Sequence, residues 1–563
     1  MWVFLLGIVH LLMPRLAQAA NFTIEQWRVV EIPLVSSQVY THPVEDVDVQ
    51  AVFTKSGGPS ITRRAFWNGS NSWLVRFAPP QTGTWTMTTI SSDATNTGLH
   101  GQVHTVQASP YSGNLDIYRR GFLKISPDRR YFTYTDGTPF FYLGDTHWLI
   151  NTENWSACNY PGCTSQFKFE VDKRRQQGFT VYQTEWLGVV SMCNITVSQI
   201  PKFLAVDDKF KYLTDAGLVV TVTVEWRTVA PNCTDTYLQA LGRYWAARYG
   251  AYPVLWTVAQ EVDSLYPFKD PPNLPAKWQV VGQALKENDY YNVPLTAHMV
   301  NESYVSWATS AWKNLAYHDW FGVQVQSGFN TTLAANYYTN AGKPVIFFEG
   351  PYENYWTDRN GNRNQSYAAF LSGWYGVGYG VAGVWDGIYD CTASTDPNCK
   401  PWTDGLFRES GNDMARLASF FKSISWWNLI PRFTNTAWGT FSDPNATRVA
   451  TDGQNMYVVY FYGSGNTTGT LKNLSSSGTY SAQWFNPRTG NYVVINPGFT
   501  TAGQWTIPVR PTAEDYVLVV TKVEIRDANF LLWINHYGQM VSTGDFNTDG
   551  KVNSLDFGVW YLP

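Results

Sequence analysis

Two short apolar runs end in glutamate, and these glutamates are the residues best suited to acid–base chemistry. The run Tyr252–Ala259 leads through Gln260 to Glu261, and Lys343–Phe348 leads to Glu349. Apolar, β-branched runs of this length are typical of buried parallel strands. Two carboxylic acids facing one another form the catalytic apparatus of glycosidic bond hydrolysis. Either glutamate alone is equally well explained as a surface residue at a strand end, but the repeated placement favours a catalytic pair.

The elements that would position this pair are alternating strands and helices between about residues 120 and 430. Helical stretches such as Phe167–Gln177, Thr236–Arg248 and Gln365–Gly376 separate the expected strands. Eight strands over about 300 residues predict a (β/α)8 TIM barrel, whose active sites lie at the C-terminal ends of the strands. The expected strands are Pro139–Gly144, Thr180–Thr184, Leu218–Val224, Val254–Ala259, Pro294–His298, Phe321–Gln326, Pro344–Phe348 and Ala382–Trp385.

Polar and aromatic residues close most of these strands. Carboxylates, histidine and tryptophan around one mouth suit a neutral polyhydroxylated ligand, because they hydrogen-bond hydroxyls and stack on sugar faces. Each residue alone is as well explained by a surface or core role, and Glu185 or Glu225 could instead pair with Arg227. The expected substrate-binding residues are Asp145, His147, Trp148, Glu185, Trp186, His298, Tyr352, Trp385 and Asp386.

Segments with alternating apolar and polar residues flank the barrel and predict two all-β sandwiches. Val44–Phe53 and Ser72–Phe77 alternate on the N-terminal side, and Met456–Tyr462 and Asp515–Val520 are strand-like on the C-terminal side. The expected chain is therefore multidomain. Its parts are a signal peptide (1–20), an N-terminal β-sandwich (21–115), the barrel (116–431), a C-terminal β-sandwich (432–522) and a calcium-binding segment (523–563).

Composition and sequence motifs limit the cellular compartment and the classes of partner that fit the chain. The 563-residue chain carries a net charge of −4 and only 15% charged residues, which argues against nucleic acid or an anionic membrane as the main partner. The apolar run Val3–Leu12 before Ala17-Gln18-Ala19 indicates a cleaved signal peptide and hence secretion. Six cysteines then suggest disulfides. Proximity favours the pairs Cys158–Cys163, Cys391–Cys399 and Cys193–Cys233, although six cysteines allow 15 pairings.

Three stretches carry a family resemblance. Phe141–Trp148, Trp256–Glu261 and Lys343–Glu353 resemble the apiosidase-like family of barrel glycoside hydrolases over residues 120 to 430. The resemblance implies that the carboxylates ending strands four and seven, Glu261 and Glu349, are catalytic. This chain has Ala259-Gln260-Glu261 where many members have Gly-Gly-Asp. The N-terminal region is similar to a sandwich found before bacterial glycosidase barrels. The segment after the barrel, through Asn486–Gly490, is similar to a sandwich that has been labelled collagen-binding.

The tail contains a calcium-loop pattern. Oxygen ligands stand at loop positions 1, 3, 5 and 12, with glycine at position 6, as in an EF-hand loop. The expected Ca²⁺ ligands are Asp545, Asn547, Asp549, the Lys551 carbonyl and Asp556. The loop resembles a dockerin repeat, which implies a cohesin-bearing scaffold as partner. Dockerins carry two such loops, and Asp527–Gln539 keeps only a helix-like pattern.

The sequence therefore predicts a secreted glycoside hydrolase of plant or microbial polysaccharide that needs no cofactor for catalysis. We expect retention of configuration, with Glu261 as acid/base and Glu349 as nucleophile about 5–5.5 Å apart. We also expect burial or Asp263 to raise the pKa of Glu261. The alternative is a non-catalytic carbohydrate- or matrix-binding protein with an inactive barrel. A collagenase is disfavoured, because the sequence has no His-Glu-x-x-His pattern.

Overall fold

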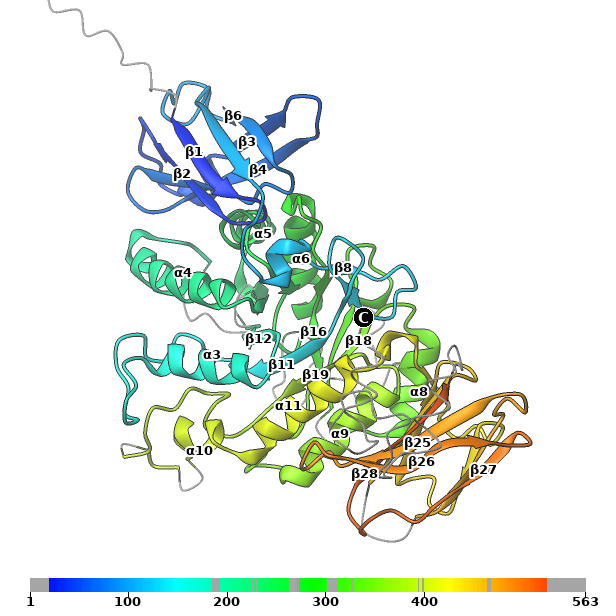
Figure 1. Ribbon diagram of the computed structural model, residues 1–563. Coiled ribbons are helices and arrows are strands. Elements are labelled where there is room, and N and C mark those ends of the chain that lie inside the picture. The colour runs from blue at the N-terminus through cyan, green and yellow to red at the C-terminus, as the bar shows by residue number, and fades with distance from the viewer. Residues whose placement is uncertain are drawn as a thin grey trace, which may run out of the picture.

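The structure is a computed structural model of the chain. It describes residues 20–184, 193–223, 227–228, 230–262, 271, 273–300, 312–325, 328–392, 394–396, 399–462 and 467–523. A parallel barrel lies in the middle, with a β-sandwich packed at either end of the chain (Figure 1). The predicted multidomain fold, a TIM barrel flanked by all-β domains, is confirmed. Among the described residues, no helix combines the length and apolarity needed to cross a membrane.

The barrel sheet runs in the order β15-β14-β13-β12-β11-β19-β18-β17-β16, and every pairing in it is parallel. Its end elements β15 and β16 are parts of one strand separated by Ala297, so the sheet closes on itself. The strands are β11 (Tyr142–Thr146), β12 (Val181–Thr184), β13 (Val219–Val222), β14 (Val254–Thr257), β15 (Leu295–Thr296), β16 (His298–Val300), β17 (Phe321–Gln324), β18 (Val345–Glu349) and β19 (Gly376–Tyr379).

Helices cover the outside of the barrel, as the alternating pattern predicts. Ser165, Thr234, Asn330 and Asp358 each cap a helix through their side-chain oxygen, which satisfies backbone N–H groups in the first turn. The helices are α3 (Gln166–Gln176), α4 (Ile200–Asp215), α5 (Asp235–Tyr249), α6 (Leu274–Asn288), α8 (Thr331–Asn340), α9 (Arg359–Leu371), α10 (Trp402–Leu406) and α11 (Glu409–Lys422).

The eighth strand was wrongly placed by the sequence pattern. It lies at Gly376–Tyr379, starting at the last residue of the expected helix Gln365–Gly376, whereas the expected strand Ala382–Trp385 forms turns. Two of its four residues are glycine, which hides the strand signal. A Cβ on Gly378 would stand 2.1 Å from the Phe348 carbonyl oxygen, so this close approach of strands tolerates only glycine. Gly383, at φ +91°, turns the chain where the strand was expected.

The first strand is also shifted. The expected Pro139–Gly144 is divided between β10 (Pro139–Phe140) and β11. β10 belongs to a small antiparallel sheet with β9 (Phe132–Thr133) and β8 (Lys124–Ile125). Asp145 therefore lies within the barrel strand rather than after it, which changes the direction of its side chain.

The N-terminal domain is a seven-stranded sheet that folds over its own core. The order is β1-β7-β6-β3-β4-β5-β2, and the expected strand Val44–Phe53 instead begins with the short helix α1 (Pro43–Asp46). The short helix α2 (Asp116–Arg119) follows β7 and leads into the barrel. The strands are β1 (Asn21–Glu25), β2 (Val30–Val35), β3 (Val49–Lys55), β4 (Ser60–Trp67), β5 (Ser72–Phe77), β6 (Gly83–Ser91) and β7 (Val103–Ser109).

A buried ion-pair cluster joins this domain to the barrel. Asp207 of α4 accepts hydrogen bonds from Arg76 of β5 and Arg248 of α5, each at 2.7 Å. Burial alone would raise the pKa of Asp207, but the two guanidinium charges outweigh burial and hold this pKa below its ordinary value. The charged carboxylate therefore stabilises the interface at neutral pH.

We expect Asp207→Asn to destabilise the fold by roughly 3–5 kcal/mol, because it leaves the buried Arg248 without a carboxylate partner and Arg76 with only the half-exposed Glu31. Since the folded-state pKa is depressed, this stabilisation is present above the ordinary aspartate pKa of about 3.9 and is lost as pH falls through the folded value. Urea unfolding at pH 7 measures the change. Asp48→Asn is the control, since the Asp48–Arg64 pair is partly exposed and should contribute about 1 kcal/mol or less. Equal losses in the two variants would contradict the assignment.

The C-terminal domain packs a six-stranded sheet on a three-stranded sheet and lies beside α9 and α11 (Figure 1). The sheet orders are β20-β22-β23-β28-β25-β26 and β21-β24-β27. Arg363 of α9 ties it to the barrel, bonding Asp515 at 2.7 Å and Asp413 of α11 at 2.8 Å. The strands are β20 (Ile430–Pro431), β21 (Gly439–Phe441), β22 (Thr447–Thr451), β23 (Met456–Phe461), β24 (Gly469–Lys472), β25 (Thr479–Phe485), β26 (Tyr492–Thr500), β27 (Gln504–Ile507) and β28 (Tyr516–Val523).

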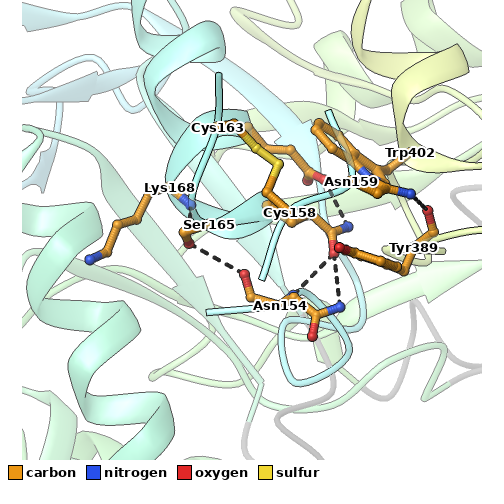
Figure 2. The surroundings of a disulfide bond; sticks show 10 residues. Asn154, Cys158, Asn159, Cys163, Ser165, Lys168, Tyr389 and Trp402 are labelled. Carbon is orange, nitrogen blue, oxygen red and sulfur yellow. Dashed lines mark hydrogen bonds between the residues drawn. A yellow bond between two sulfur atoms is a disulfide. The ribbon is translucent and has the colours of Figure 1, made fainter. Parts of the chain in front are cut away.

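All three expected disulfides are present: Cys158–Cys163, Cys193–Cys233 and Cys391–Cys399. The first fastens the loop after β11, which also contacts the segments after β19 (Figure 2). There Asn159 accepts a hydrogen bond from the Trp402 indole at 2.7 Å and donates one to the Tyr389 carbonyl at 2.8 Å. The disulfide loops therefore lie on the side of the barrel where the strands end.

Candidate active site

Glu349 is the last residue of β18 and is 5% exposed. The hydroxyl of Tyr352 donates a hydrogen bond to Oε1 of Glu349 and accepts one from the indole of Trp148. Tyr352 comes from the turn after β18, and Trp148 from the loop after β11. The carboxylate is thus held by a relay of two buried aromatic donors, which suits a group that must keep one orientation.

His298 lies between the two predicted catalytic glutamates. Its Nε2 is 3.5 Å from Oε2 of Glu349, and its ring stacks near Trp148 with centroids 5.8 Å apart. Its backbone N–H donates to Ala259 and its carbonyl accepts from Val262, at 3.2 and 3.1 Å. The segment carrying Glu261 is therefore fastened to the start of β16, while the His298 side chain contacts Glu349. Both glutamates therefore come from segments that contact His298.

Glu261 occupies an unusual backbone position four residues beyond β14. Its φ is +49°, a left-handed conformation that costs a residue with a Cβ roughly 1–2 kcal/mol. Such strain tends to be kept at functional positions. Arg227 donates a hydrogen bond to Oε2 of Glu261, and the side chains are 3% and 12% exposed. Among the described residues, no hydrogen bond to Oε1 of Glu261 is found.

Sequence reasoning offered Arg227 as a partner of Glu185 or Glu225, and did not foresee its bond to Glu261. Asp263, the neighbour expected to raise the pKa of Glu261, lies outside the described residues.

Asp145 and His147 do not face the mouth, which corrects the expectation that they bind substrate. Asp145 accepts a hydrogen bond from Arg174 of α3 at 2.6 Å. His147 is hydrogen-bonded to a carboxylate through each of its two ring nitrogens. Those carboxylates are Asp145 at 2.8 Å and Glu153 at 2.6 Å. Successive side chains of a barrel strand point alternately into the barrel and outward. Because Asp145 lies within β11, its side chain points outward to the helices and not into the mouth.

The cluster behind β11 is a closed charge network. Burial disfavours the imidazolium of His147, but Glu153 and Asp145 outweigh burial and raise its pKa to about 10. Burial and the Glu153 charge raise the pKa of Glu170 well above its ordinary value. Sequence reasoning missed both acids because neither ends a strand. His147, Glu153 and Glu170 place ligand-type atoms within 4.8 Å of one another. Both ring nitrogens of His147 are engaged by carboxylates, Nε2 by Asp145 and Nδ1 by Glu153.

Trp148, Tyr352 and Trp385 form an aromatic wall beside Glu349. Trp385 stacks on Tyr352 with centroids 5.6 Å apart and planes at 18°. The backbone N–H of Trp148 donates to the Trp385 carbonyl at 2.9 Å, which joins the loops after β11 and β19. Burial raises the pKa of Asp386, next in sequence, to about 6. The structure brings these residues together although the strand expected to carry Trp385 is not there.

Several expected site residues lie outside the described part of the chain. They are Glu185 and Trp186 and the calcium ligands Asp545, Asn547, Asp549, Lys551 and Asp556. Residues 1–19 of the expected signal peptide also lie outside it. These expectations stay predictions.

Residues 126–428 match the family described as "Apiosidase-like, catalytic domain", which covers more than half of the chain. The chain belongs to the apiosidase-like family. Residues 23–92 match "Domain of unknown function (DUF5060)", and residues 439–521 match "Putative collagen-binding domain of a collagenase". No curated protein matches the chain. With the barrel and its strand-end carboxylates, the family shows that the protein is a glycosidase.

Solved structures share the fold of this apiosidase-like glycosidase. A "putative glycoside hydrolase" from Bacteroides vulgatus superposes with a TM-score of 0.66 at 16% identity, covering 90% of this chain and all of the other. A glycoside hydrolase family 5 protein from the same organism gives 0.56 at 17% identity, covering 72% and 94%. At these identities the likeness establishes the architecture, including both sandwiches in the first case.

Proposed function

We propose that this glycosidase hydrolyses a plant or microbial polysaccharide by a retaining mechanism, with Glu349 as nucleophile and Glu261 as acid/base. The observation that supports the proposal is that the segment carrying Glu261 is hydrogen-bonded to the backbone of His298, whose ring is 3.5 Å from Glu349. A nucleophile must stay ionised and fixed, and the hydrogen bond from Tyr352 supports this state of Glu349.

Glu261 is suited to the two proton transfers. It would protonate the leaving oxygen through Oε1 as Glu349 attacks the anomeric carbon, so that the C–O bond breaks while a glycosyl–Glu349 ester forms. Arg227 then stabilises the Glu261 carboxylate that results. The carboxylate next takes a proton from water, whose oxygen attacks the anomeric carbon and releases Glu349.

The experiment that tests the function is release of reducing sugar from a panel of pectic, xylan and mannan polysaccharides. The proposal expects steady release from at least one polymer. A protein that binds a polymer but releases no sugar from any would instead favour the non-catalytic carbohydrate-binding alternative.

We further propose that the protein is secreted and that its tail binds Ca²⁺. The three disulfides support an oxidising compartment. The ligand spacing of Asp545–Asp556 supports the calcium loop, and a cohesin-bearing scaffold is the partner that a dockerin-like repeat would take. Calorimetric titration of the intact protein with Ca²⁺ should give heat that Asp549→Ala abolishes. Equal heats for both proteins would contradict the site.

A further inference from the structure

A groove of about 300 Å³ is lined by residues of the barrel and of the C-terminal sandwich. This volume is at the lower end of the range of small-ligand pockets. Its walls come from the turn after β18, from helix α9 and from the end of β23. The lining includes Phe329, Pro351, Trp356, Asn364, Gln365 and Tyr462.

An aromatic path connects this groove with Glu349. Tyr352, which donates to Glu349, has its ring 5.4 Å from that of Trp356, and Trp356 is 4.4 Å from Tyr355. Trp356 is 62% exposed and Tyr355 48% exposed. Two large aromatic side chains left open to water next to a catalytic carboxylate are unfavourable for solubility, and they are what a sugar ring stacks on.

The polar groups of the groove suit hydroxyls. The Asn364 side-chain amide lies in the groove lining, 2.6 Å from the Tyr460 hydroxyl. The Gln365 NH₂ is held by the Asn362 amide oxygen at 3.2 Å and the Pro351 carbonyl at 3.4 Å, so its Oε1 is the group to accept. The Gln365 oxygen and the Asn364 amide suit a sugar hydroxyl, which both donates and accepts hydrogen bonds.

The groove carries no formal charge. Among its described lining residues there is no aspartate, glutamate, lysine or arginine. This composition disfavours a phosphate, a metal ion or a uronic acid as occupant, because each of these is bound through countercharge. A neutral sugar, held by stacking and hydroxyl contacts, fits the lining best.

We propose that this groove is a distal subsite that binds a neutral sugar unit of the polymeric substrate, several units away from the cleaved bond. The inference rests on the proposed hydrolysis of a polysaccharide and deepens it. The substrate chain would run from Glu349 past Tyr352 and Trp356 to Tyr462, so the C-terminal sandwich contributes to recognition of the polymer.

Affinity electrophoresis in gels containing galactomannan, arabinoxylan, pectic galactan or polygalacturonate tests the subsite without requiring turnover. A neutral polymer should retard the wild-type protein, Trp356→Ala should lose most of the retardation, and Trp356→Tyr should restore part of it. Tyr290→Ala is the matched control, because Tyr290 is 40% exposed and precedes β15 at the opposite end of the barrel. Equal retardation of wild type and Trp356→Ala, stronger retardation by polygalacturonate, or no retardation by any polymer would overturn the subsite.

Kinetics separate failure of the subsite from failure of the catalytic proposal. On the polymer that the wild type cleaves, Trp356→Ala should raise KM about tenfold with kcat within about twofold, and on 4-nitrophenyl monoglycosides it should change neither. An active wild type with an unchanged Trp356→Ala variant counts against the subsite alone. A wild type that is retarded by a polymer but cleaves neither polymer nor aryl glycoside counts against the catalytic proposal alone.

Discussion

Replacing Glu349 by Gln should lower kcat by at least about 10³-fold on every substrate while the protein remains folded. The amide keeps the shape of the side chain but cannot attack the anomeric carbon, and losses of catalytic groups that act as a unit are typically this large or larger. The hydrogen bond from Tyr352 to Oε1 can be kept, because an amide oxygen also accepts.

Steady-state kinetics on the cleaved polymer and on an aryl glycoside measure this loss. Glu287→Gln is the matched control, since Glu287 is exposed on α6 and accepts only a hydrogen bond from Gln283 at 2.9 Å. Both variants should unfold at the wild-type temperature to within a few degrees. Near-wild-type turnover in Glu349→Gln would place the nucleophile elsewhere.

Glu261→Gln should separate substrates by their leaving groups. General acid catalysis contributes about 10²–10⁴-fold, and an activated aryl leaving group needs little of it. We therefore expect a loss of that size on the polymer and a much smaller loss in bond cleavage on a 2,4-dinitrophenyl glycoside. Removing the carboxylate also leaves Arg227 without its charged partner, so the variant should be checked for folding.

The ratio of polymer to aryl-glycoside activity is the decisive quantity for Glu261. Added azide should restore part of the aryl-glycoside turnover, because this small nucleophile can attack the glycosyl-enzyme without a general base. An equal loss on both substrates, with no response to azide, would argue that Glu261 only positions other groups.

The sequence was informative where a strand has a continuous apolar pattern. β14 and β18 show such runs; Glu349 ends β18, and Glu261 follows β14 by four residues. β19 could not be found in this way, because close packing against Phe348 demands glycine at position 378, and glycine has little strand propensity.

Other features depend on contacts between distant segments. A shift of one residue in the register of β11 decides whether Asp145 faces the mouth or Arg174. The alternation of polar and apolar residues in the sequence does not determine that register. The bond between Arg227 and Glu261 joins two loops 34 residues apart. The sequence does not single out Trp356 as a binding residue. An exposed aromatic residue in a turn becomes informative only when its neighbours Tyr352 and Tyr462 are known.

Proton NMR of the first-formed sugar tests the central claim most directly. If Glu349 forms a glycosyl ester and Glu261 activates the second attack, the anomeric proton of the product has the configuration of the substrate before mutarotation sets in. Inversion would require a water molecule between sugar and carboxylate, with the carboxyl groups about 6.5–9.5 Å apart. Retention in the first spectra is the predicted result, and an inverted anomer would contradict the assignment of Glu349 as nucleophile.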